Sequence, residues 1–376
     1  MPVIAKLVLD TFSEIYPMIR QYAHAEFWDL SQHQTVPGAV YVIGRKQYVD
    51  NQQRVRSMAE SGQVRIVMSN PHEGSETLIG QLTHLGLLDL AQQHKILIVG
   101  GGDMPPEWPC LQYDKFLPEI LDYPENVKII AHSDNIYQLH NKPYKFLFLN
   151  GRRRNHRKYM IEKLDILGLL DSALCTNLDS TPGFGNRYQL WHNGVNVMQQ
   201  SRPCWTLPPQ YEVPRYADTG NPKSANAYVK FDLFKNEWGE IYLHLKPYED
   251  TYFSLVTETV FDIPYSFRTE KIWKPIAMGH PWIAVANCGF YRDIHNLGFR
   301  TYSHVIDESF DQIDNNQDRL DRIAAVVNDL CQQDLAAFLQ ECYTVSKYNQ
   351  QHHKEMAIKV RQEFPHRFLQ FINERS

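Results

Sequence analysis

A cluster of positive charge follows an apolar run that begins at residue 146. The run ends in Asn150-Gly151, and the basic residues that come directly after it are Arg152, Arg153, Arg154, His156, Arg157 and Lys158. Guanidinium groups match phosphate oxygens with a planar fork of donors, and ammonium groups bind the same oxygens as point charges. These residue types predict an anion site, with Asn150, Arg154 and Arg157 as candidate ligands.

The expected position of this cluster strengthens the prediction. A helix is expected from about residue 155, and cations at a helix N-terminus cost a few tenths of a kcal/mol each unless an anion lies among them. Ligands of open α/β sheets bind at the carboxyl ends of strands, where this turn is expected. The alternative is a solvated basic turn or a surface patch for RNA.

A second junction of the same kind lies further along the chain. An apolar strand ends in Thr257-Glu258-Thr259, and after a loop Thr269-Glu270-Lys271 opens a helix that closes at Gly279. Thr269 is a natural N-cap, the Glu270 carboxylate can accept both hydroxyls of a ribose, and Lys271 can reach a diphosphate. Plain helix capping is the alternative interpretation.

The elements that must position these residues follow a repeated α/β pattern. Short apolar runs predict strands near residues 39–44, 64–68, 95–102, 127–132, 145–151, 252–259, 281–287 and 299–302, after a first strand close to the start of the chain. Helix-periodic segments between them predict an open sheet flanked by helices, followed by a second α/β unit. A long helix is expected over about 317–343, and a terminal helix interrupted by Pro365. The Pro/Asn/Tyr-rich middle, 176–228, predicts loops.

The composition narrows the class of protein to which the chain can belong. The chain has 376 residues, 43% hydrophobic and 22% charged, which is typical of a folded protein with two domains. Its net charge of −5 disfavours extended contact with a polyanion, so an anion site must be local. No apolar run is long enough to span a membrane, and six scattered cysteines without CxxC spacing predict reduced thiols in a cytoplasmic protein.

The two junctions together resemble the donor-binding region of the α-1,3-fucosyltransferases. That family's pattern reads Phe-Glu-Asn, a short loop, Thr-Glu-Lys and a Pro-Ile/Val strand, and here Glu258, Thr269-Glu270-Lys271 and PWIAV follow the same order. KFLFLNGRRRNHRKYMIEKL is similar to the family's strand, Ser-Asn turn and helix-opening Arg, on which Arg157 falls. The resemblance covers roughly residues 145–310. GFRTYSHVIDESFDQI also resembles uncharacterised bacterial and phage glycosyltransferase-like proteins.

This resemblance implies a GT-B-like glycosyltransferase with two Rossmann-like domains facing each other across a cleft. The expected divisions are an acceptor domain over 1–142, a nucleotide-sugar domain over 143–345 and a helical segment over 346–376. By resemblance, Arg157 and Lys271 neutralise the diphosphate, Glu270 binds the ribose and Glu258 lies near the sugar. No cofactor is expected, and since the chain has no DxD triplet, cationic side chains would replace the metal.

The family's general base is a Glu in a Glu-Ser-Pro segment, and here the comparable place reads SNPHEGSE. The expected Glu is absent. Glu73 or Glu76 of the same loop, and Asp103 or Glu107 after the next strand, are the alternatives, because a carboxylate near an acceptor hydroxyl can take its proton. Glu73 and Asp103 are the candidates preferred here. The Gly100-Gly101-Gly102 run lacks dinucleotide-binding spacing and predicts a tight loop.

Three hypotheses follow. The first is a transferase that moves a sugar from a nucleoside diphosphate to a hydroxyl of a glycan or small molecule. The second is a phage-type enzyme that glycosylates modified DNA, with the arginines on the nucleic-acid backbone. The third is a nucleotide-binding module without a competent base. The scattered histidines show no metal spacing, and Tyr188, Trp191 and His192 either stack on the nucleotide base or pack in their own loop.

Overall fold

The computed structural model describes residues 6–139, 141–151, 154–178, 187–211, 241 and 243–374. The chain divides into two compact units: residues 1–118, 265–267 and 356–376 form unit 1, and residues 119–264 and 268–355 form unit 2. Residues 119–142, which the sequence assigns to the first domain, lie in unit 2. Within the described ranges, no helix is long and apolar enough to cross a membrane.

Unit 1 is built on a six-stranded parallel sheet in the order β2-β1-β3-β4-β5-β6. Its strands are β1 (Lys6–Asp10), β2 (Ala23–Phe27), β3 (Ala39–Gly44), β4 (Arg65–Asn70), β5 (Ile96–Gly100) and β6 (Cys110–Gln112). Its helices are α1 (Tyr16–Ile19), α2 (Arg45–Asp50), α3 (Gln52–Ser61), α4 (Ser75–His84) and α5 (Leu88–Gln92), and α6 (Phe116–Glu119) lies at the border of the two units.

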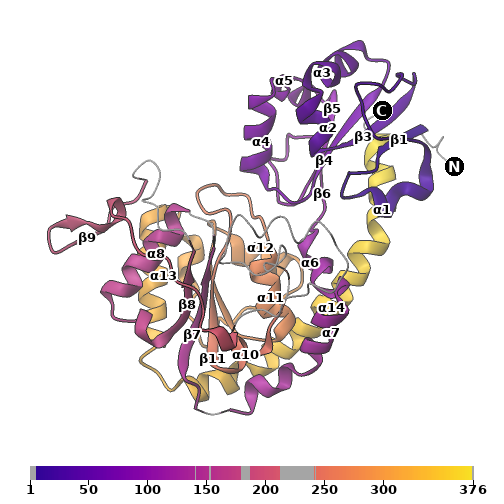
Figure 1. The fold of residues 1–376 in the computed structure, drawn as a ribbon. Helices are drawn as coiled ribbons and strands as arrows, with labels where there is room; N and C mark the ends of the chain where they lie inside the picture. Colours follow the sequence, from indigo (N-terminus) through magenta and orange to yellow (C-terminus); the bar gives the residue numbers. More distant parts are fainter. Residues whose placement is uncertain are drawn as a thin grey trace. The chain divides into compact units, whose positions relative to one another are not determined.

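Helices cover both faces of this sheet, because its strands are apolar on both sides (Figure 1). One face packs against α2, α3, α4 and α5 through residues such as Tyr48, Val55 and Leu82. The other face packs against α1 and the carboxyl end of α14 (Leu335–Glu374), where Phe364 and Phe368 are fully buried. Unit 1 is therefore a three-layer α/β unit of Rossmann-like type.

Unit 2 contains a four-stranded parallel sheet in the order β12-β11-β7-β8. Its strands are β7 (Tyr144–Asn150), β8 (Ala173–Asn177), β11 (Thr251–Thr257) and β12 (Trp282–Val285), and β9 (Trp191–His192) and β10 (Val195–Asn196) form a separate hairpin. Its helices are α7 (Pro124–Ala131), α8 (Asn155–Ile166), α10 (Leu245–Glu249), α11 (Glu270–Met278), α12 (Phe290–Asn296), α13 (Asn316–Leu330) and the first part of α14. This unit is also Rossmann-like.

Two of the predicted strands are wrong. Residues 127–132 lie in or just after α7 rather than in a strand, because Pro124 and Glu125 start a helix before a run too short to define its own period. Residues 299–302 form no strand, since the backbone N–H and carbonyl of Arg300 bond to the side chain of Asn349.

The long helix expected over 317–343 is two helices. α13 ends at Leu330, and Asp334 accepts hydrogen bonds from the N–H groups of Ala336 and Ala337 at the start of α14. Nor does Pro365 interrupt the terminal helix, because α14 continues through it to Glu374. Part of the loop-rich middle segment lies outside the described residues.

Candidate anion-binding site at the ends of β7 and β11

The sheet of unit 2 has its topological switch point between β7 and β11. β7 is followed in the chain by β8 on one side, and β11 is followed by β12 on the other. The connections after the two neighbouring strands therefore leave in opposite directions. In open α/β sheets, ligands bind at this point, outside the carboxyl ends of the strands. Here those ends are Asn150 and Thr257.

Asn150 links the two strand ends. Its side chain is 2% exposed, and its Oδ1 accepts a hydrogen bond from Thr257 Oγ1 at 2.8 Å. Its Nδ2 is buried and has no hydrogen-bond partner within the described residues. Exchanging the positions of Oδ1 and Nδ2 by rotating the amide would leave Oδ1 without a partner instead. Because an unpaired buried polar atom is costly, this amide is suited to a polar ligand.

The first turn of α8 is tied to the end of β11. Arg157 is buried, and its Nη2 donates to the carbonyl oxygens of Thr257 and Glu258, both at 3.2 Å. His156 Nε2 lies 2.8 Å from the Glu258 carbonyl oxygen. Burial lowers the pKa of His156 well below its usual value, and the nearby charge of Arg157 lowers it further. The neutral imidazole therefore donates this bond. Arg154, at the N-cap, is exposed and its side chain does not cap the helix.

Glu258 connects β11 to the start of α11. Its carboxylate is fully buried and accepts bonds from the backbone N–H of Thr269 at 3.0 Å and from Thr269 Oγ1 at 2.7 Å. The N–H of Thr259 also donates to it, at 3.1 Å. Burial raises the Glu258 pKa, while Lys271 opposes the rise. Glu258 thus fixes the loop that presents the start of α11.

Glu270 and Lys271 form an ion pair at the first turn of α11, with Lys271 Nζ 2.5 Å from Glu270 Oε1. Lys271 Nζ also donates to Thr269 Oγ1 at 3.2 Å. Burial by itself raises the Glu270 pKa, but Lys271 and Lys274 outweigh it and the pKa is lowered. Glu270 is therefore ionised at neutral pH, and the half-exposed ammonium of Lys271 is the cation nearest to it.

The structure thus brings most of the predicted ligands together. Hydrogen bonds join Asn150, Arg157, Glu258, Thr269, Glu270 and Lys271 through Thr257, across the two strand ends. The donors at this edge are the Asn150 amide, the N-terminus of α8 and the Lys271 ammonium. Such an arrangement can hold an anionic group.

The predicted base candidates lie in unit 1, at the same edge of its sheet. Glu73 follows β4, and its carbonyl accepts from the N–H of Gly101, which follows β5. Asp103 lies beyond that glycine, and its N–H donates to the Ser266 carbonyl at 2.8 Å. Both side chains are partly exposed. The exposed Glu76 opens α4, and Glu107, also exposed, precedes β6.

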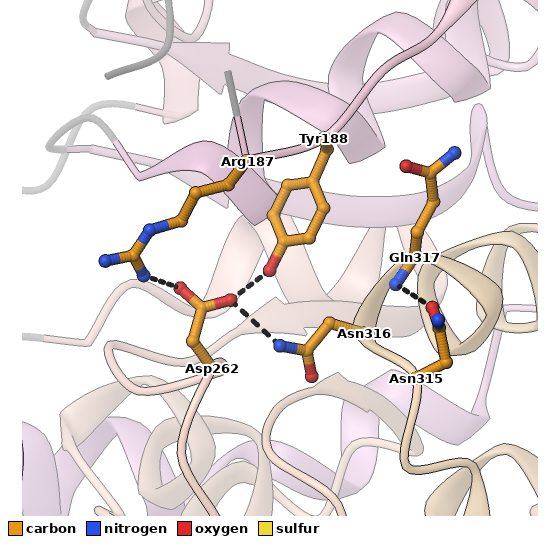
Figure 2. A pocket seen from close by; sticks show the side chains of 6 residues that line it. All are labelled: Arg187, Tyr188, Asp262, Asn315, Asn316 and Gln317. Atoms are coloured by element: carbon orange, nitrogen blue, oxygen red, sulfur yellow. Dashed lines mark hydrogen bonds and ion pairs between the residues drawn. The ribbon is translucent and has the colours of Figure 1, made fainter. Parts of the chain in front are cut away.

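A polar pocket of about 460 Å³ lies at the start of α13 in unit 2 (Figure 2). Its lining residues are Arg187, Tyr188, Asp262, Asn315, Asn316 and Gln317. Figure 2 shows Asp262 between three donors, which are Arg187, the Tyr188 hydroxyl and Asn316. Arg187 Nη1 lies 2.5 Å from the carboxylate, and Asn316 Nδ2 lies 3.2 Å from it. Because these donors already satisfy the carboxylate, Asp262 holds the pocket wall together. No sequence motif indicates this group.

The aromatic residues of the middle segment differ in how deeply they are buried. Tyr188 is buried against Tyr159 and Phe261, whereas Trp191 is 64% exposed on the β9–β10 hairpin beside the exposed His192. Tyr188 therefore packs in unit 2.

Sequence reasoning also missed a pair of side chains in unit 1. His72 Nδ1 lies 3.4 Å from Glu14 Oε1, although the two residues are far apart in the chain. No spacing rule connects the loop after β1 with the loop after β4, so only the fold shows this contact. Within the described residues, no three His, Cys, Asp or Glu side chains gather closely enough to hold a metal. Comparison with protein-family models, curated proteins and solved structures finds no match.

Proposed function

We propose that the protein is a metal-independent glycosyltransferase that moves a sugar from a nucleoside-diphosphate sugar to an acceptor hydroxyl. The observation that carries the proposal is the hydrogen-bonded group at the switch point of unit 2, which joins residues of two separate strand-to-helix junctions. The resemblance to the α-1,3-fucosyltransferases rests on these same residues. In this proposal the two units form a GT-B-like architecture, with the donor bound by unit 2 and the acceptor by unit 1.

The diphosphate is proposed to bind at the N-terminus of α8 and beside Lys271. The unpaired amide of Asn150, the exposed Arg154 and the first-turn N–H groups supply donors there. When the bond between the anomeric carbon and the diphosphate oxygen breaks, its electron pair passes to the diphosphate. Fixed donors whose interaction strengthens as that charge grows lower the barrier.

Glu270 is proposed to accept hydrogen bonds from the ribose hydroxyls. It is ionised and forms an ion pair with Lys271, which supports the proposal because an acceptor suited to ribose hydroxyls lies beside a donor suited to a diphosphate. Arg157, to which the resemblance assigns neutralisation of the diphosphate, is proposed instead to hold the end of β11, because its Nη2 donates to two backbone carbonyls there. Glu258 has the same positioning role toward α11.

The test is binding of GDP, UDP, CDP, ADP and dTDP to the whole chain, followed by thermal unfolding in the presence of EDTA. One diphosphate is expected to stabilise the wild type, by about 2.7 kcal/mol at 100 times its Kd. Lys271→Ala should abolish the shift. Lys246→Ala is the matched control, because Lys246 lies in α10, just before the amino end of β11, and forms an ion pair with Asp250 there.

A wild type that none of the five nucleotides stabilises would contradict the proposal. A shift that survives Lys271→Ala would place the nucleotide elsewhere. The salt dependence of binding distinguishes the DNA-directed alternative from the proposed function. Affinity for a nucleic-acid backbone falls steeply as the salt concentration rises, whereas affinity for a single diphosphate falls less.

A further inference from the structure

His72 stands between a carboxylate and an ammonium group at the carboxyl edge of the unit 1 sheet. Its Nδ1 lies 3.4 Å from Glu14 Oε1, and its Nε2 contacts Lys115 Nζ. Glu14 follows β1, His72 follows β4 and Lys115 follows β6. Three strand ends thus bring together groups that are distant in sequence. The His72 side chain is 30% exposed, so a ligand can reach it.

These neighbours determine which nitrogen of His72 carries the proton. A lysine ammonium has donors only, so Nε2 facing Lys115 must be the bare nitrogen of the neutral ring. Nδ1 then carries the proton and lies 3.4 Å from Glu14 Oε1, an ion-pair distance that is longer than a formed hydrogen bond. A carboxylate that accepts the Nδ1 proton as a hydrogen bond orients a neutral imidazole and leaves Nε2 as the proton acceptor. Contacts of this type are often long in a ligand-free enzyme and shorten when the substrate binds.

The surroundings of the pair contain buried polar atoms without partners. Gly44 of β3 lies beside both Ser13 and Ser69. Ser69 on β4 is its register partner, and a Cβ added at Gly44 would lie 3.2 Å from Ser13 Cα. The hydroxyls of Ser13 and Ser69 are buried and lack hydrogen-bond partners within the described residues, as does Oε2 of Glu14.

β1 and β3 also form the switch point of this sheet, because the connections after them lead to opposite sides. The position is the expected ligand site of an open α/β unit. The charges around it are of both signs, since Asp10 and Glu14 lie near Lys46, and Lys115 contacts His72. Together with the hydroxyls of Ser13 and Ser69, these charges fit an uncharged molecule rich in hydroxyl groups rather than an anion.

We propose that His72 is the general base of the transfer and that Glu14 is its positioning residue. This inference rests on the proposed function and names the acceptor class, a neutral polyol such as a sugar. The acceptor hydroxyl replaces Lys115 as the donor to Nε2. Its oxygen forms the new bond to the anomeric carbon, the bond to the diphosphate breaks with its electron pair, and the hydroxyl proton moves to Nε2.

The experiment measures release of nucleoside diphosphate from GDP-fucose, GDP-mannose, UDP-glucose, ADP-glucose, CDP-glucose and dTDP-glucose, with water or free hexoses as acceptors. His72→Ala is expected to lower kcat about 10²- to 10⁴-fold, the usual contribution of a general base. The Kd of the bound nucleotide should stay within about twofold of the wild-type value, because unit 2 is unchanged. His84→Ala, an exposed histidine in the last turn of α4, is the matched control and should keep wild-type turnover.

Two further measurements separate chemistry from folding. Added imidazole should restore part of the turnover of His72→Gly but not of Lys271→Ala. Glu14→Gln should lower kcat with little change in KM, and Glu14→Asp should recover part of the loss.

The outcomes distinguish this inference from the proposed function. A His72→Ala protein that binds the nucleotide and turns over at the wild-type rate overturns the inference alone. So does a wild type that binds the nucleotide but turns over none of the donors. If no diphosphate binds the wild type, the proposed function fails and the assignment of His72 fails with it.

Discussion

Two carboxylates in unit 2, the buried Glu270 and the partly buried Glu308, differ in what stabilises their charge. Glu270 has Lys271 beside it and its pKa is lowered. Among the described residues Glu308 has no cationic partner, and it accepts hydrogen bonds from Thr301 Oγ1 at 2.7 Å and from the Tyr302 N–H at 2.9 Å. Burial raises the Glu308 pKa to about 7, and these bonds only reduce the rise. The difference makes Glu308 a pH-dependent element of stability, outside the proposed site.

The sign of that dependence follows from linkage. Between its ordinary pKa of 4.5 and about 7, Glu308 keeps a proton in the folded chain that it has lost in the unfolded chain. Its contribution is therefore fully present below pH 4.5 and is lost as pH rises through 7. We expect the wild type to lose up to about 3 kcal/mol more than Glu308→Gln between pH 4.5 and pH 8. Chemical unfolding at both pH values measures this, with substitution of the exposed Glu341 of α14 by Gln as the control. Equal losses in wild type and Glu308→Gln would contradict the prediction.

At this scale the sequence predicts residue types better than their partners. Thr269 caps α11 as predicted, because a cap depends only on neighbours in the chain. The bonds of Arg157 to the Thr257 and Glu258 carbonyls, and the contact of His72 with Glu14, link residues that are far apart in sequence. No spacing encodes such contacts, so they required the fold.

Among the elements, the loop after β5 is shaped by a close backbone approach. A Cβ on Gly101 would lie 2.0 Å from the carbonyl oxygen of Pro71 and 2.8 Å from Cε2 of Phe267. Gly101 N–H also donates to the Glu73 carbonyl at 3.0 Å. Only a residue without a side chain lets the loops after β4 and β5 meet, and these loops carry Glu73 and Asp103.

Substituting two glycines of unit 1 tests this. Gly101→Ala is expected to destabilise unit 1 by about 3 kcal/mol or more, because backbone atoms would have to move to admit the methyl group. Gly80 is an exposed residue in the middle of α4, with open space where a Cβ would lie. Gly80→Ala is therefore expected to stabilise unit 1 by about 0.5–1 kcal/mol. Urea unfolding gives both values. A neutral Gly101→Ala would mean that the two loops do not need this approach.

Predicted strands agree with the structure where an apolar run is flanked by turn residues, as for β3, β4, β5 and β11. The edge strands β2, β6 and β8 are not predicted, because their sequences AHAEF, CLQ and ALCTN are not runs of consecutive large apolar residues. The run at 127–132 predicts a strand, but residues 127–131 belong to α7, because six residues are too few to distinguish a strand period from a helix period.

At the scale of the whole molecule, the last helix completes the first unit. Residues 346–376 were expected to form a separate helical segment, but residues 356–374 of α14 belong to unit 1. There Phe364, Phe368 and Ile372 are fully buried beside Leu7 and other residues of the first strands. A sequence pattern shows that such a helix has an apolar face, but not which sheet that face covers. Contacts between residues as distant in sequence as Leu7 and Phe368 are expected to slow the folding of unit 1.

Phe368 provides the sharpest test of this packing. Phe368→Ala removes a fully buried ring from the face of the sheet formed by residues such as Leu9 and Val42, so we expect a loss of about 3–5 kcal/mol in the free energy of unfolding of unit 1. Ile358→Ala, on the same helix but 56% exposed, should change it by less than about 1 kcal/mol. Hydrogen exchange of the β1, β3 and β4 amides measures the effect within unit 1. If these amides keep their protection in Phe368→Ala, the end of α14 does not support the sheet, and unit 1 must owe its stability to α2, α3, α4 and α5 on the opposite face.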